Sequence, residues 1–104
     1  MSAPHELFIR HENGKIVECF LPHRVSDRMF EYMLPRMYEV APEDADEFEG
    51  AFYGDCLTIT HVPASRYMAV YKLIMEACDN VAQLKPCKAD LQKALQDDPR
   101  YQAV

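Results

Sequence analysis

The 104-residue chain has no apolar run long enough to cross a bilayer, and it has only three glycines and three serines. A transmembrane helix needs about 20 consecutive apolar residues. The first ten residues, MSAPHELFIR, carry scattered charges where a signal peptide needs an unbroken apolar segment. We therefore expect a cytoplasmic protein that does not associate with a membrane.

Glycine and serine are placed in none of the patterns that bind phosphate or activate a serine nucleophile. Gly14, Gly50 and Gly54 belong to no Walker or dinucleotide motif, and no Gly-x-Ser-x-Gly elbow is present. The isoelectric point is about 5.1 and the eleven Lys and Arg residues are scattered along the chain. Because nucleic-acid binding depends on neutralising phosphates, we expect no direct binding of nucleic acid.

The four cysteines lack the spacing of a metal site and the signature of a cysteine nucleophile. No Cys-x2-Cys knuckle occurs, and Cys56 and His61 would point to opposite faces of a strand. We read the cysteines as free thiols of a reducing compartment: Cys19, Cys56, Cys78 and Cys87. The sequence predicts no metal, no cofactor and no catalytic residue, and a non-enzymatic role is favoured while an enzymatic one stays open.

The length and the 49% hydrophobic content indicate one folded domain over residues 1–104, which can bury a core without crosslinks. Residues 99–104 follow the last amphipathic segment and begin with a proline, so they are predicted to form a loose tail.

Periodicity and turn residues predict the element order β-β-α-α-β-α-α. The pair Asn13-Gly14 is typical of a type I′ hairpin turn, and such a turn sets Glu12 opposite Lys15, Arg10 opposite Val17 and Phe8 opposite Cys19. Proline at position 35 predicts a kink or a restart of the first helix. It stays open whether Phe52-Tyr53 form a strand of their own. The predicted strands are Glu6–His11, Lys15–Leu21 and Cys56–Val62, and the predicted helices are 26–40, Ala41–Gly50, Pro63–Asn80 and Pro86–Asp98.

These elements predict an α+β fold, with a small, mainly antiparallel three-stranded sheet packed by three to four helices. The N-terminal hairpin and one central strand would form this sheet. Methionine, tyrosine and phenylalanine are in excess on two of the helices, and a homodimer would cover such apolar surface.

Charge is distributed very unevenly along the chain. Seven acids and no Lys or Arg lie between Glu39 and Asp55, whereas the rest of the chain holds ten acids against eleven bases. The best functional hypothesis is a small protein–protein interaction module, of inhibitor, immunity or adaptor type, that presents an acidic helix to a basic partner. Its predicted partner-binding residues are Glu43, Asp44, Asp46, Glu47 and Glu49. The simpler alternative is a solvated helix face that contributes only to solubility.

A second hypothesis belongs to a different functional class. His61, Tyr67 and Tyr71 would line a pocket between the sheet and the long helix of a dimeric small-ligand-binding domain or small enzyme. Tyr67 and Tyr71 also fit the apolar face of a core helix, and His61 also fits a core position on the strand face of Leu57 and Ile59, so none of them requires a ligand.

Overall fold

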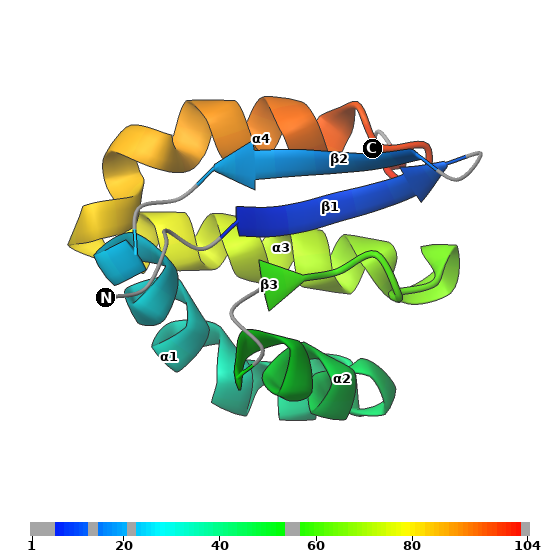
Figure 1. Ribbon diagram of the computed structural model, residues 1–104, viewed down its shortest axis with the longest axis horizontal. Coiled ribbons are helices and arrows are strands. Elements are labelled where there is room, and N and C mark those ends of the chain that lie inside the picture. The colour runs from blue at the N-terminus through cyan, green and yellow to red at the C-terminus, as the bar shows by residue number, and fades with distance from the viewer. Residues whose placement is uncertain (1–5, 13–14, 21–22, 54–56, 103–104) are drawn as a thin grey trace.

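The part of the chain that the structure describes forms five helical segments and three strands. A computed structural model describes residues 6–12, 15–20, 23–53 and 57–102, with side chains described over 25–53 and 58–102. Figure 1 shows α4 running beside the β1–β2 hairpin, with α1 and α2 packed together on the other side of the molecule. The elements are β1 (Glu6–Glu12), β2 (Lys15–Phe20), α1 (His23–Val40), α2 (Pro42–Tyr53), β3 (Leu57–Thr58), α3 (Ala64–Asn80), the 3-10 helix η1 (Ala82–Cys87) and α4 (Lys88–Gln96).

The predicted α+β fold, organised by a mainly antiparallel three-stranded sheet, is wrong. Helices hold 81% of the residues whose side chains are described, and the buried core identified there comes from α1, α2, α3, η1, α4 and the turn before α3. The third strand is not central: the strand order is β2-β1-β3, so β3 lies at an edge. It covers two residues and runs parallel to β1. The domain is therefore predominantly helical, with a short N-terminal hairpin beside the helices.

The strand predicted over Cys56–Val62 is short because its threonines bond locally. The Thr58 hydroxyl Oγ1 accepts a hydrogen bond from the Thr60 amide at 3.2 Å, and the Val62 amide donates to the Ile59 carbonyl at 3.1 Å. Threonine side chains that bond nearby backbone groups compete with a strand ladder. The β-branched run thus turns after Thr58 and leads into α3.

The two N-terminal strands pair antiparallel, and their backbone register can be compared with the predicted one. Glu12 lies opposite Lys15 and Arg10 opposite Val17, as the turn predicted. An irregularity between Phe8 and Arg10 then shifts the register, so that Phe8 faces Glu18 rather than Cys19. The turn residues themselves lie outside the described residues.

Several helix boundaries differ from the predicted ones, and α1 and α2 depart from the prediction in extent. Helix α1 runs unbroken from His23 to Val40 with Pro35 inside it, so the predicted restart is not observed. Helix α2 continues past Gly50 to Tyr53, which places Phe52 and Tyr53 in its last turn rather than in a strand. An added Cβ at Gly50 would meet nothing within 4 Å, so packing does not enforce a stop there.

The core is formed by apolar side chains that recur three or four residues apart on α1 and α3. The large α1 side chains in it are Met29, Phe30, Met33 and Met37, and those of α3 are Tyr67, Val70, Tyr71, Leu73 and Ile74. The methionine and aromatic content that suggested a homodimer is thus largely used within one chain. The homodimer stays a prediction.

Residues that follow α4 return to the domain. Arg100 donates from Nη1 to the carbonyls of Ile59 and Val62 at 2.9 and 2.6 Å, and the Tyr101 ring packs edge-on against Tyr71 at 5.0 Å. Residues 103 and 104 of the predicted loose tail lie outside the described residues, and the looseness of 99–104 stays a prediction.

None of the described helices combines the length and the hydropathy that a membrane span requires.

Candidate protein-binding surface

The outward side of α2 carries most of the acidic residues singled out in the sequence. Ala45 and Phe48 turn one side of this helix into the core, where both are fully buried. The carboxylates on its other sides are directed to solvent or lie partly covered. Glu43, Asp46 and Glu47 are exposed and Glu49 is half-buried, and we call these four residues the acidic face of α2.

Asp44, the fifth predicted partner-binding residue, does not belong to this face. It is only 4% exposed, and its carboxylate accepts two hydrogen bonds from Arg66, from Nε at 2.7 Å and from Nη2 at 3.1 Å. Such a bidentate pair is both charge-assisted and geometrically specific. Asp44 therefore joins the first turn of α2 to the first turn of α3, and its charge is neutralised within the chain.

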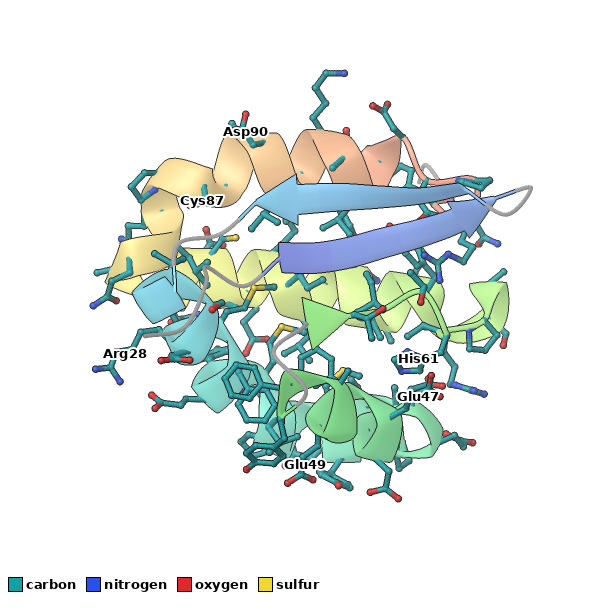
Figure 2. All side chains as sticks on the ribbon, viewed as in Figure 1. Arg28, Glu47, Glu49, His61, Cys87 and Asp90 are labelled. Carbon is teal, nitrogen blue, oxygen red and sulfur yellow. The ribbon has the colours of Figure 1, made fainter. Side chains whose placement is uncertain are left out.

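His61 contacts the same part of α2. Its Nε2 lies 3.1 Å from the carbonyl oxygen of Asp44, and because a carbonyl only accepts, Nε2 carries the hydrogen. The other ring nitrogen, Nδ1, is buried without a hydrogen bond and lies 3.8 Å from Glu47 Oε2. Figure 2 shows the His61 ring beside Glu47. His61 thus packs against α2 beside Asp44 and Glu47.

The alternative pocket residues are directed to different parts of the fold. Tyr67 is fully buried and its hydroxyl donates to the Leu95 carbonyl at 2.8 Å. The Tyr71 hydroxyl accepts from Gln92 and Gln96 of α4, at 3.4 and 3.1 Å. His61 contacts α2 and the two tyrosine hydroxyls contact α4, so their hydrogen bonds direct the three side chains to different neighbours, and a shared pocket stays a prediction. The two tyrosines belong to the packing between α3 and α4.

Tyr38, which the sequence reasoning did not single out, holds two carboxylates of the acidic face. Its hydroxyl lies 2.6 Å from Asp46 Oδ1 and 2.9 Å from Glu49 Oε1. A phenol has one hydrogen, so it serves one carboxylate at a time. These hydrogen bonds, that to Asp46 first, raise the pKa of Tyr38 above its usual value, since a phenolate would face two negative charges.

Exposed apolar surface gathers on the same two helices. Among the residues with described side chains, the large hydrophobic ones that are exposed are Tyr38 (43%), Val40 (43%) and Tyr53 (71%). They lie on the last turns of α1 and α2. Asp46, Glu49 and Tyr53 are spaced three and four residues apart, which places them on one side of α2. This spacing is the sequence signal that could have identified Tyr53.

An open cavity of about 390 Å³ lies between α1 and α3. Arg36 and Glu76 form an ion pair at 3.3 Å, and the Tyr32 hydroxyl donates to Glu76, which raises the pKa of Tyr32. Lys72 and Glu39 complete a lining with two positive and two negative charges. The remaining lining residues are apolar: Val40, Ala69 and Leu73. Because both signs of charge are balanced, this cavity indicates no class of ligand.

The described residues offer little for metal or thiol chemistry. No three of their His, Cys, Asp and Glu side chains are grouped in a way that could hold a metal ion. Cys78 is fully buried, and burial raises the pKa of the free Cys87 thiol. A raised pKa lowers the fraction of reactive thiolate. Cys19 and Cys56 have no described side chains.

Comparisons with protein-family models, curated proteins and solved structures found no match to this chain.

Proposed function

We infer that this protein is a non-enzymatic interaction module that binds a basic protein through the acidic face of α2. One observation carries the proposal. The four carboxylates of this face and the exposed side chains Tyr38 and Tyr53 occur together on α1 and α2, in a segment without Lys or Arg. Protein interfaces are enriched in tyrosine at their contact points, and acidic surfaces accelerate encounter with basic partners.

The charge of the face is only partly offset by neighbouring bases. Arg66 contacts α2, but its guanidinium is engaged by Asp44, and Glu43 lies 3.9 Å from it. The segment from Glu39 to Tyr53 contains no base of its own. Since charges within about 8 Å of one another act together at physiological salt, a partner would meet a predominantly negative surface.

Tyr38 also reduces the conformational freedom of the face. Its hydroxyl keeps Asp46 and Glu49 close together before any partner arrives. Side chains that are already ordered lose less entropy on binding. We therefore expect the partner to place a basic side chain near this pair of carboxylates.

The test compares two variants that lose the same number of negative charges. In the face variant, Glu43, Glu47 and Glu49 become Gln and Asp46 becomes Asn. In the control variant the acids changed lie on α3, on α4 and directly after α4: Glu76→Gln, Asp79→Asn, Asp90→Asn and Asp97→Asn. All eight residues are at least partly exposed, so both variants are expected to fold, which circular dichroism would verify.

The partner would be captured from native lysate on the wild-type protein, purified, and titrated by calorimetry against all three proteins. We expect a basic partner whose affinity falls about tenfold or more in the face variant, because several favourable pairs are lost together. The control variant is expected to keep the wild-type affinity within about threefold, since long-range attraction alone is screened by salt. Equal losses in the two variants, or none in the face variant, would refute the proposal.

A further inference from the structure

A second cavity, of about 370 Å³, lies between the N-terminal half of α1 and the last turn of α2. Its described lining consists only of aromatic and acidic side chains: Asp27, Phe30, Glu31, Phe52 and Tyr53. No basic side chain is among them. This composition differs from that of the α1–α3 cavity, where both signs of charge are balanced.

The aromatic rings of this cavity form a corner. Phe30 and Phe52 stack with centroids 3.8 Å apart and planes 7° from parallel, and Phe48 supports Phe30 from within the core at 5.8 Å. Tyr53 stands nearly upright on this pair, at 71° to Phe30 and 72° to Phe52. Because Tyr53 is 71% exposed, part of its ring surface is open to a ligand.

The carboxylates of the cavity come from the first half of α1. Glu31 accepts a hydrogen bond from Arg28 Nη1 at 2.7 Å, but both side chains of this pair are more than half exposed. An exposed pair three residues apart on a helix contributes little stability. A cation supplied by a partner can therefore replace Arg28 at low cost.

The cavity continues the acidic face of α2. Asp46, Glu49 and Tyr53 lie on one side of that helix, and a rise of 1.5 Å per residue separates Asp46 from Tyr53 by about 10 Å. Figure 2 shows Glu49 next to stacked aromatic rings, on a different side of α2 from Glu47, which lies beside His61. A basic segment lying along the face would thus reach the cavity with its next side chain.

We propose that this cavity receives an arginine side chain of the basic partner, with its guanidinium against the Tyr53 ring and its N–H groups directed to Glu31. The inference rests on the proposed function and specifies how that partner is recognised. Arginine fits better than lysine because its planar, weakly hydrated guanidinium stacks on aromatic faces and also donates hydrogen bonds in its plane.

A small probe tests the cavity without the partner. N-acetyl-arginine methylamide and its neutral isostere N-acetyl-citrulline methylamide would be titrated into the isotopically labelled full chain at low ionic strength and followed by NMR. We expect the arginine probe to shift resonances of Glu31, Phe52 and Tyr53 and to bind at least about threefold more tightly than the citrulline probe, as a cation–π contact at an exposed site requires. Equal affinities, or shifts confined to other regions, would overturn the proposal.

Two variants and one control assign the contacts. Tyr53→Leu is expected to keep the fold, since the side chain is largely exposed, and to lower the affinity for the arginine probe about two- to fivefold. Glu31→Gln is expected to lower it by a similar factor, whereas Glu39→Gln, an exposed acid of the other cavity, leaves it unchanged. An arginine affinity that Tyr53→Leu does not change would overturn the proposed site.

The partner assay separates the two proposals. If the face variant no longer binds the partner and Tyr53→Leu still does, the proposed function stands and the proposed arginine site in the cavity is wrong. If no basic partner depends on the acidic face, the proposed function is wrong, and the probe titration still decides whether the cavity binds a guanidinium.

Discussion

Replacing Arg100 with methionine is expected to lower the free energy of unfolding by about 3 to 5 kcal/mol, the range for breaking a buried ion pair from one side. The Asp98 side chain is completely buried and that of Arg100 is 14% exposed. Two hydrogen bonds join them, from Nε at 2.9 Å and from Nη2 at 2.7 Å. Methionine keeps most of the apolar stem, so the loss reports on the guanidinium.

The guanidinium also satisfies two backbone carbonyls, and this adds to the expected loss. Arg100 Nη1 donates to Ile59 and Val62, and its guanidinium carbon lies 4.5 Å from the centroid of the Tyr67 ring. Each carbonyl left without a partner in a buried place costs about 1 to 3 kcal/mol. A domain of this length has a total stability of about 5 to 15 kcal/mol, so the variant should be marginally stable.

Urea denaturation followed by circular dichroism measures the effect. With a urea dependence of about 1 to 3 kcal/mol per molar, the midpoint should fall by at least about 1 M. Adding Asp98→Asn should restore part of the loss, because the uncompensated buried charge is then removed. The control is Arg28→Met, which breaks an exposed pair and should change stability by less than about 0.5 kcal/mol. A loss below about 1 kcal/mol in Arg100→Met would refute the reasoning.

Two further predictions concern Asp44 and Tyr38, which lie next to the acidic face. Asp44→Asn should destabilise the protein by about 1 to 3 kcal/mol in the same denaturation assay, which is less than Arg100→Met because Arg66 is about one-third exposed. It should lower the affinity for the partner less than the substitution of any one acid of the acidic face does. Tyr38 should ionise later than a free tyrosine when absorbance is titrated through pH 10, with the delayed component absent in Tyr38→Phe. Since the pKa of Tyr38 is raised in the folded state, the unfolded chain loses this proton first as the pH rises. The contribution of Tyr38 to stability should therefore be present below pH 10 and decline above it. An absorbance titration identical to that of Tyr38→Phe would contradict this prediction.

Helix positions in this chain were predictable because apolar spacing and proline punctuation act locally. The helix ends were less predictable. Gly50 favours a stop only where the chain needs a left-handed residue, and the Phe30–Phe52 stack stabilises one more turn of α2. Tertiary packing of the aromatic rings thus outweighed the local propensity of one glycine.

The acidic face was predictable as a charged helix surface, and the burial of Asp44, which is outside that face, could also have been recognised. Asp44 and Phe48 are four residues apart, which places Asp44 on the side of α2 that carries the core residue. What the sequence could not supply is the partner of Asp44, because Arg66 lies 22 residues further along the chain. The cavity between α1 and α2 could not be predicted for the same reason, since Glu31 and Tyr53 come from different helices.

Besides the local bonds of Thr58 and Thr60, a contact from the residues after α4 accounts for the missing strand over residues 59–62. A strand over 59–62 would satisfy its carbonyls by pairing with a neighbouring strand. Here the Arg100 guanidinium donates hydrogen bonds to the carbonyls of Ile59 and Val62 in place of a strand. The buried carboxylate of Asp98 holds the guanidinium in position. A side chain 38 residues away in sequence thus replaces a strand partner. The periodicity of a single sequence cannot predict this replacement. It shows which residues favour a strand, but not which distant side chain donates hydrogen bonds to their backbone carbonyls. The Arg100→Met variant therefore tests this account as well as the ion pair: if residues 59–62 keep their turn without the guanidinium, the turn is encoded locally by Thr58 and Thr60.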